Sequence, residues 1–321
     1  MTRLKELFKV YSSPMIFIFG YFLFIFFKKN VNFMQQSYVR SYCLTSGLIS
    51  DLITSIIKIK HKFKSYNNRN FNDEDLRILK DKGYVIIKDY LDDQFIEKIY
   101  YLTSSLKCSY NKTQNTSEKV IYDENIHKLP AYGYETSDLV KTKEINDLIK
   151  FFKKSKIINL VESYFESKAY ILDVNMWWSN VSDKIDSYSA QDFHFDLDSI
   201  KFLKVFIYLK DVTENEGPHV YVEGSHKSFT KPYDILKRGY SRVSDDEISK
   251  YYDYKKIQKV IGKKGTIFIG DTKCFHKGLV PTKGNRLIFE LTFSNSKFGS
   301  KKINNVFLDD YIKMNFSHNI Q

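Results

Sequence analysis

The motif His194-Phe195-Asp196 constrains this chain most, because it stands just before an apolar run, residues 202–209, of the kind found in buried strands. Residues two apart on an extended strand point to the same face, so the motif presents an imidazole and a carboxylate side by side. One more imidazole facing them would complete the 2-His-1-carboxylate triad that binds Fe(II) and leaves positions open for a co-substrate and dioxygen. Taken alone, the pair also fits an ordinary strand end at the surface.

His276 is the candidate for the second imidazole. It follows the predicted strand at 265–269 and a short turn, which would aim the ring into the mouth of a barrel. Arg286 then opens the apolar strand at 286–291, and an arginine at that place points inward and needs an anionic partner. Its planar fork suits a carboxylate. By itself Arg286 would also fit a strand-end salt bridge.

The composition fits one large globular domain, or one domain with an appendage. The 321 residues are 43% hydrophobic, enough for a core, and 16% aromatic, which favours a sheet-rich body. The three cysteines, Cys43, Cys108 and Cys274, contain no CxxC pair, which argues against a disulfide framework or a zinc finger. Such cysteine usage agrees with a reducing compartment, and we expect a cytoplasmic location.

The net charge of +12 is concentrated near the N-terminus. Residues 1–70 hold eleven Lys or Arg against two acids, a charge of +9, whereas the remaining residues hold 39 against 36. The main body therefore offers no basic groove, and we expect no nucleic-acid partner.

Two N-terminal stretches combine apolar and basic residues. Residues 14–27 are apolar and flanked by lysines, but the run is shorter than the roughly 20 residues of a full span. Residues 47–64 show apolar residues at helical spacing with a basic opposite side. Each stretch fits a helix packed on the domain or an element seated at a membrane surface. Residues 1–65 are thus a candidate membrane contact, which would make the cytoplasmic protein membrane-associated.

The rest of the chain begins with helices and continues mainly as strands. A polar linker is expected at 65–70 and a polar, irregular loop, of the kind that forms lids, at 107–134. The insertion at 228–256 is a second candidate for substrate specificity. This order predicts an α+β domain built on a β-barrel or sandwich. The expected helices lie at 72–82 (capped by Asn72), 93–106 and within 137–167, and the expected strands at 84–88, 170–179, 202–210, 220–223, 265–269 and 286–293.

From about Phe71 to Phe293 the chain resembles the phytanoyl-CoA dioxygenase-like family of Fe(II)- and 2-oxoglutarate-dependent oxygenases. Each matching piece is modest, but five in this order are specific. They are the opening helix and strand Leu79 to Ile87, the segment Phe193-His194-Phe195-Asp196, the segment Leu209 to Pro218, the turn Val222 to Lys227 with its Gly-Ser-His, and the distal pair His276 and Arg286.

The resemblance implies a double-stranded β-helix, a cupin-like jelly roll, with N-terminal and flanking helices. It divides the chain into the N-terminal segment 1–70, the dioxygenase domain 71–300 and a C-terminal tail 301–321. It further implies that His194, Asp196 and His276 bind iron, and that Arg286 binds the distal carboxylate of 2-oxoglutarate.

The implied activity is an oxidoreductase that uses Fe(II), 2-oxoglutarate and dioxygen to hydroxylate a C–H bond of a small-molecule or lipid-like substrate. The acid at Asp196 speaks against halogenation, because related halogenases carry a small residue there. The alternative is a catalytically degenerate jelly-roll binding module held at a membrane surface.

Four further residues are candidates for contact with substrate or for support of the site: Trp177, Gln191, His219 and His226. Core packing is the competing interpretation for Trp177, and a place in the turn is the competing one for His226. Gly278 departs from the family pattern, which often has a hydroxyl residue there to support the co-substrate; Thr266, Thr282 or Thr292 would have to compensate.

Overall fold

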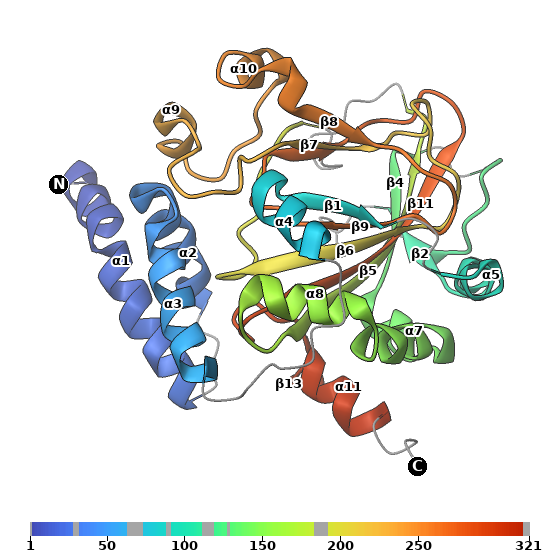
Figure 1. The fold of residues 1–321 in the computed structure, drawn as a ribbon, viewed down its shortest axis with the longest axis horizontal. Coiled ribbons are helices and arrows are strands. Elements are labelled where there is room, and N and C mark those ends of the chain that lie inside the picture. The colour runs from blue at the N-terminus through green and yellow to red at the C-terminus, as the bar shows by residue number, and fades with distance from the viewer. Residues whose placement is uncertain are drawn as a thin grey trace.

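The computed structural model describes residues 2–27, 32–62, 73–87, 91–110, 119–126, 129–182 and 192–316 (Figure 1). The predicted linker at 65–70, the cap Asn72 and the candidate Gln191 lie outside the described residues.

Two antiparallel sheets form the jelly roll. The larger sheet has the order β1-β9-β6-β11-β5-β4-β2-β3, the smaller one has the order β10-β7-β8, and a separate hairpin joins β12 to β13. The α+β jelly-roll class predicted from the sequence is therefore confirmed. The strands are β1 (Tyr84–Ile87), β2 (Cys108–Ser109), β3 (Lys119–Val120), β4 (Ala131–Tyr134), β5 (Tyr170–Asn180), β6 (Phe202–Tyr208), β7 (His219–Val222), β8 (Ile257–Val260), β9 (Ile267–Gly270), β10 (His276–Gly278), β11 (Asn285–Ser294), β12 (Lys302–Ile303) and β13 (Val306–Phe307).

The larger sheet has two differently covered faces because side chains alternate along each strand. Val205 and Leu291 belong to a core that the sheet shares with flanking helices, whereas Phe206 and Ile288 belong to the core between the two sheets. Lys204 lies on the same side of β6 as Phe206. The flanking helices are α4 (Asp73–Lys82), α5 (Asp93–Tyr101), α6 (Thr136–Leu139), α7 (Lys143–Lys153), α8 (Lys156–Phe165) and α11 (Leu308–Phe316).

Three N-terminal helices pack beside the jelly roll: α1 (Thr2–Phe27), α2 (Asn32–Thr45) and α3 (Leu48–Lys62) (Figure 1). They share a buried core with the chain around the His-x-Asp motif, including Phe195 and Phe298. The Tyr38 hydroxyl donates a hydrogen bond to the Ser199 carbonyl at 2.8 Å, and the Gln35 amide donates to the Leu197 carbonyl at 2.7 Å. The N-terminal helices thus support the segment that carries the motif from behind.

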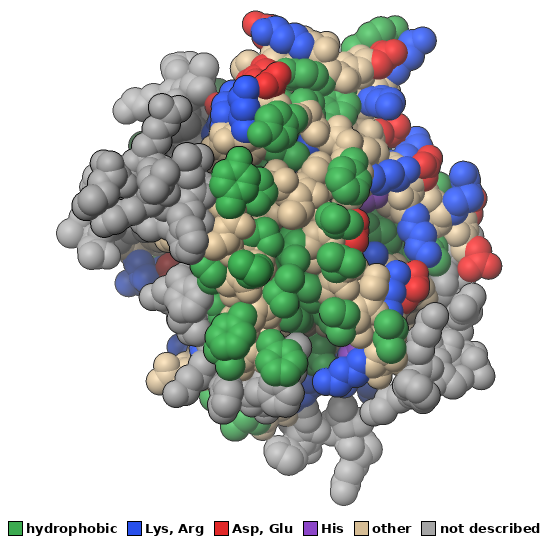
Figure 2. Space-filling model, turned by 90° about the vertical axis from the view of Figure 1, so that its left-hand side faces the viewer, with side chains coloured by type: hydrophobic (Ala, Val, Ile, Leu, Met, Phe, Trp, Pro, Cys, Tyr) green, Lys and Arg blue, Asp and Glu red, His purple; other side chains and the backbone are tan. Residues whose placement is uncertain are grey.

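The opposite sides of α1 and α3 expose large hydrophobic side chains. Figure 2 shows hydrophobic side chains gathered on this face of the molecule. We call these ten residues the apolar face: Tyr11, Met15, Ile16, Ile18, Phe19 and Phe22 of α1 with Leu48, Leu52, Ile56 and Ile59 of α3. Within the described residues no single helix is long and apolar enough to cross a bilayer, while Met34–Thr45 and Leu48–His61 pass that test as a pair bent by 111°.

Two segments differ from their predictions, and two others contain helices where no structure was predicted. The helix α2 was not expected, because its buried residues are mainly tyrosines among polar ones. The segment 107–134, expected to be irregular, contributes the short strands β2, β3 and β4 to one edge of the larger sheet. The insertion at 228–256 contains the short helices α9 (Tyr233–Leu236) and α10 (Asp245–Ser249). At the C-terminus, Leu308 and Ile312 of α11 are buried in the main core.

Candidate metal centre

Backbone pairing brings the two predicted histidines together. His194 and His276 form an antiparallel bridge, with N–H to carbonyl distances of 3.0 and 2.8 Å in the two directions. The Asp196 N–H donates to the Thr272 carbonyl at 2.8 Å, which continues the pairing. The motif therefore extends the smaller sheet beside β10, and both residues of His-x-Asp face the distal histidine.

The side chains of His194, Asp196 and His276 converge at one point. Each offers one ligand atom, and these atoms lie within 4.8 Å of one another. The Asp196 carboxylate oxygens lie 3.8 Å from the His194 Nε2 atom and 3.5 Å from the His276 Nε2 atom. All three residues are largely buried, with His194 and His276 5% and 4% exposed. This is the donor set and the spacing of a mononuclear metal site.

The orientation of both imidazoles is set by backbone carbonyls. The Nδ1 atom of His194 lies 2.9 Å from the Asp192 oxygen, and the Nδ1 atom of His276 lies 2.9 Å from the Cys274 oxygen. A carbonyl oxygen only accepts, so each Nδ1 carries a proton, and Nε2 is the nitrogen of each ring that is left for a metal ion. Both Nε2 atoms lie beside the Asp196 carboxylate, on the side of the ring that faces the centre.

The protonation states also suit metal binding. Burial, reinforced by the neighbouring His276, lowers the pKa of His194 to about 3, so its ring is neutral at physiological pH. For Asp196 burial acts to raise the pKa, but Lys204 and His276 outweigh it and hold the pKa well below its usual range. The centre therefore presents a neutral imidazole at His194 and an ionised carboxylate at Asp196.

Lys204 supplies the positive charge beside that carboxylate. Its Nζ atom lies 2.8 Å from Asp196 Oδ2 and 3.1 Å from Asp198 Oδ2. Burial would lower the pKa of Lys204, but the two aspartates raise it well above the usual value. Lys204 was not singled out from the sequence. The signal was a lysine in the middle of a strand whose other residues are apolar.

Arg286 is buried inside the jelly roll and faces no carboxylate among the described residues. Its guanidinium donates to the Gly217 carbonyl and, at 3.1 Å, to the Ser179 hydroxyl, while its Nε atom has no partner in this part of the structure. Gly278 leaves room for it, because a Cβ atom there would stand 3.0 Å from Arg286 Nη2. A buried cation with donor capacity to spare fits an anionic ligand.

Two other polar side chains near the centre lack partners within the described residues. Both ring nitrogens of His219 and the hydroxyl of Tyr221 are buried without a hydrogen bond. The His219 ring stacks against His276 at 5.7 Å between centroids, and the Tyr221 ring at 5.9 Å. Buried polar groups are normally paired, so these orphaned atoms indicate that a polar ligand belongs here.

The remaining predicted residues lie in different places. Trp177 packs partly buried against the core between the sheets, so both interpretations of it stay open. His226 lies away from the centre, with Nε2 3.2 Å from the Lys80 oxygen and Nδ1 3.5 Å from Cys274 Sγ. Ser179 lies opposite Arg286 in the β5–β11 pairing and accepts a hydrogen bond from its guanidinium. This residue was not predicted from the sequence.

Comparison with known proteins agrees with this geometry. The model of the family described as phytanoyl-CoA dioxygenase matches residues 79–280. No curated protein sequence matches. Among solved structures, HygX from Streptomyces hygroscopicus with nickel and 2-oxoglutarate bound is 13% identical, covers 74% of this chain and 96% of its own, and has a TM-score of 0.52. EctD from S. alaskensis with bound Fe is 12% identical, covers 72% and 79%, and has a TM-score of 0.51.

Proposed function

Because the chain belongs to the phytanoyl-CoA dioxygenase family, whose members are Fe(II)- and 2-oxoglutarate-dependent dioxygenases, we propose that it hydroxylates a C–H bond of a small-molecule or lipid-like substrate. The observation that carries this proposal is the buried cluster of His194, Asp196 and His276, with Arg286 inside the same jelly roll facing no carboxylate of the described residues.

His194, Asp196 and His276 would hold Fe(II). Two nitrogen donors and one carboxylate on one side of the ion are the ligands that non-haem iron oxygenases use. The neutral His194 ring and the ionised Asp196 carboxylate mean that these two ligands have no proton to lose before the metal binds. Lys204 keeps the carboxylate ionised and holds its position.

Arg286 would bind the distal carboxylate of 2-oxoglutarate. Its guanidinium is held by Gly217 and Ser179 and retains an unpaired Nε donor, so it is oriented before the ligand arrives. His219 and Tyr221 offer their unpaired polar atoms beside the centre. When bound, iron and 2-oxoglutarate supply dioxygen activation; the chain binds and orients these groups and excludes bulk water.

The competing interpretation, a degenerate binding module, predicts a damaged centre. The intact donor set and the uncompensated arginine favour the enzyme. The test is formation of succinate from 2-oxoglutarate by purified protein with Fe(II), compared with His194→Ala. We expect iron-dependent succinate in the wild type and none in the variant. Equal succinate from both proteins would contradict the assignment of the centre.

We further propose that the apolar face binds an anionic membrane surface. Ten large hydrophobic side chains on α1 and α3 are exposed, more than isolated surface residues account for. The segment that carries them has a charge of +9, which complements anionic lipids. One side of each helix is buried against the protein and the other side is exposed and apolar. Such helices suit contact with a membrane surface rather than a transmembrane span.

A further inference from the structure

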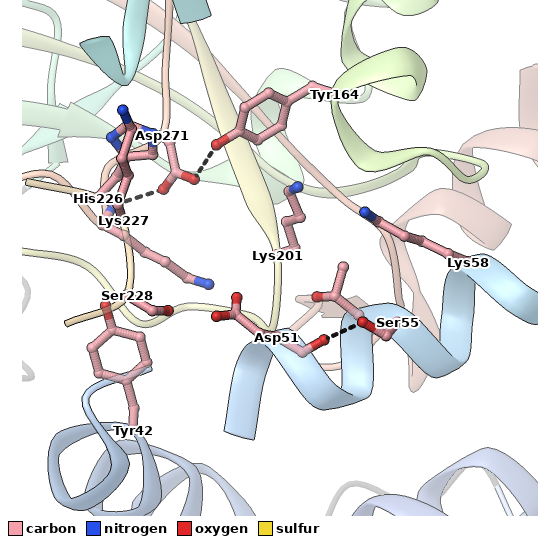
Figure 3. Close-up of a pocket in the computed structure, with 12 residues that line it drawn as sticks. Tyr42, Asp51, Ser55, Lys58, Tyr164, Lys201, His226, Lys227, Ser228 and Asp271 are labelled. Atoms are coloured by element: carbon pink, nitrogen blue, oxygen red, sulfur yellow. Dashed lines mark hydrogen bonds between the residues drawn. The ribbon is translucent and has the colours of Figure 1, made fainter. Parts of the chain in front are cut away.

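A polar cavity of about 360 Å³ lies between α3 and the jelly roll, apart from the metal centre (Figure 3). Its residues come from α2 and α3, from Tyr164 on α8, from Lys201 just before β6, and from the loops at 226–228 and 271–273. None of the proposed metal ligands lines it. A cavity of this volume is in the range of small-molecule sites.

Four lysines line the cavity, and two of them have acidic partners. Lys58 pairs with Glu166 at 3.1 Å, and Lys227 pairs with Asp81 at 2.9 Å. These two ammonium groups are therefore neutralised by acids that do not line the cavity.

The other two lysines have no acidic partner in the described part of the chain. Lys273, which is 7% exposed, donates to the Ile200 carbonyl. Lys201 lies 4.3 Å above the Tyr164 ring, and no hydrogen bond or ion pair to a described residue holds its ammonium group. Figure 3 shows this ammonium in the cavity between Tyr164 and Lys58.

Asp271, which lines the same cavity, forms no ion pair with either lysine. Its carboxylate accepts hydrogen bonds from the Tyr164 hydroxyl at 2.7 Å and from the Lys273 backbone N–H at 3.0 Å. Burial first, and Lys58 next, lower the pKa of Lys201 to about 8, while Asp271 acts in the opposite direction. The cavity therefore has donors and charge for an anion.

We propose that this cavity binds the phosphate group of a hydroxyl-bearing molecule. Lys201 and Lys273, which have no acidic partner among the described residues, would take the phosphate oxygens. The opposite side, formed by Asp51 with the hydroxyls of Ser55 and Ser228, suits the hydroxyl groups of the ligand (Figure 3). A phosphate ion is only a few times larger than a water molecule, which occupies about 30 Å³ in the liquid, so the cavity of about 360 Å³ has room for more than the phosphate group.

The source of the phosphate is either a free metabolite or a lipid headgroup. The helix α3 contributes both to the cavity, through Asp51, Ser55 and Lys58, and to the apolar face, through Leu52 and Ile56. A headgroup could therefore reach the cavity from a membrane that the apolar face contacts. The site itself does not depend on the proposed oxygenase activity.

The test is calorimetric titration of the full-length protein with glycerol 3-phosphate at constant ionic strength. We expect binding to the wild type and a roughly tenfold to hundredfold weaker affinity in Lys201→Met, since one charge-assisted hydrogen bond is lost. Lys250→Met removes an exposed lysine elsewhere and should bind like the wild type. Lys201→Arg should retain most of the affinity. Circular dichroism verifies that each variant folds.

Absence of binding to the wild type, or equal affinity of Lys201→Met and the wild type, would overturn the proposal. Flotation with phosphatidylcholine vesicles containing phosphatidic acid separates the two sources. Reduced flotation of Lys201→Met assigns the cavity to a headgroup. Unchanged flotation with lost glycerol 3-phosphate binding assigns it to a free phosphorylated molecule. Succinate formation is not part of either readout, so failure here leaves the oxygenase proposal standing.

Discussion

The ammonium group of Lys204 lies 2.8 Å from the Asp196 carboxylate inside the jelly roll. A metal ion at the centre would bind the same carboxylate. The pair is mostly buried, with side chains 14% and 12% exposed. Breaking such a pair leaves an uncompensated buried charge, whereas a bound cation can replace the missing partner.

Lys204→Met should therefore destabilise the metal-free protein by about 3 kcal/mol. Divalent metal should restore much of that loss, because the ion supplies the positive charge that Asp196 has lost. Thermal unfolding with and without Mn(II), used as a redox-stable stand-in, measures this. The rise in melting temperature on adding metal should be larger in Lys204→Met than in the wild type or Lys204→Arg. A smaller rise would show that Lys204 does not compete with metal for the carboxylate.

Arg286→Lys should keep the charge and lose the bidentate fork. We expect its affinity for 2-oxoglutarate to fall by roughly tenfold to hundredfold, the cost of one hydrogen bond to a charged group, while metal affinity stays unchanged. Calorimetric titration of Mn(II) into the metal-free protein measures the metal affinity, and titration of 2-oxoglutarate into the Mn(II)-loaded protein measures the other. Unaltered 2-oxoglutarate affinity would remove Arg286 as the clamp.

Gly278→Val tests the same contact from the other side. A Cβ atom at this position would stand 3.0 Å from Arg286 Nη2, so a branched side chain must displace the guanidinium. We expect weaker 2-oxoglutarate binding with the metal centre intact. The control is Gly133→Ala. A Cβ atom at Gly133 meets no atom within 4 Å and the residue has no positive φ, so this variant should bind 2-oxoglutarate like the wild type.

His226 should make stability depend on pH. Burial lowers its pKa from 6.5 to about 4, so the unfolded chain binds this proton at a higher pH than the folded one. Stability is then fully present above about pH 6.5 and falls as the pH drops toward 4, by about 3 kcal/mol for this group. His226→Gln should flatten the fall in urea-unfolding free energy between these pH values. An unchanged slope would show that His226 does not contribute.

The apolar face predicts binding to anionic vesicles. Replacing Met15, Phe19, Ile56 and Ile59 with serine should abolish flotation with phosphatidylserine-containing vesicles. A matched variant replaces four equally exposed hydrophobic residues elsewhere, namely Phe229, Tyr233, Tyr254 and Met314, and should float like the wild type. If the wild type does not float and instead runs as a dimer that the first variant disrupts, the face binds a second copy of the chain.

The centre was predictable because its chemistry follows local rules. The two-residue spacing of His194 and Asp196 fixes their common face on any extended segment, and Arg286 stood out as a charge in an apolar strand. Lys204 has the same signature, yet its partners Asp196 and Asp198 could be identified only from the folded chain. Ser179 was out of reach because its role depends on the register between β5 and β11.

The N-terminal helices show the other limit of sequence reasoning. The apolar residues of α1 and α3 predicted helices, but the side of α1 that packs on the jelly roll depends on distant partners such as Phe298. The lysine cavity likewise joins α3, α8 and two loops that are far apart in the sequence. Neither arrangement leaves a local pattern, so both required the three-dimensional structure.

The most direct measurement is anaerobic addition of Fe(II) and 2-oxoglutarate to the full-length protein, followed by visible absorption spectroscopy. A weak charge-transfer band reports chelation of iron by the 2-oxo acid within the protein. We predict that the band forms in the wild type and is absent in Asp196→Ala, because the iron loses its carboxylate ligand. A band of equal intensity in both proteins, or none in the wild type, would contradict the assignment of His194, Asp196 and His276 as the iron site.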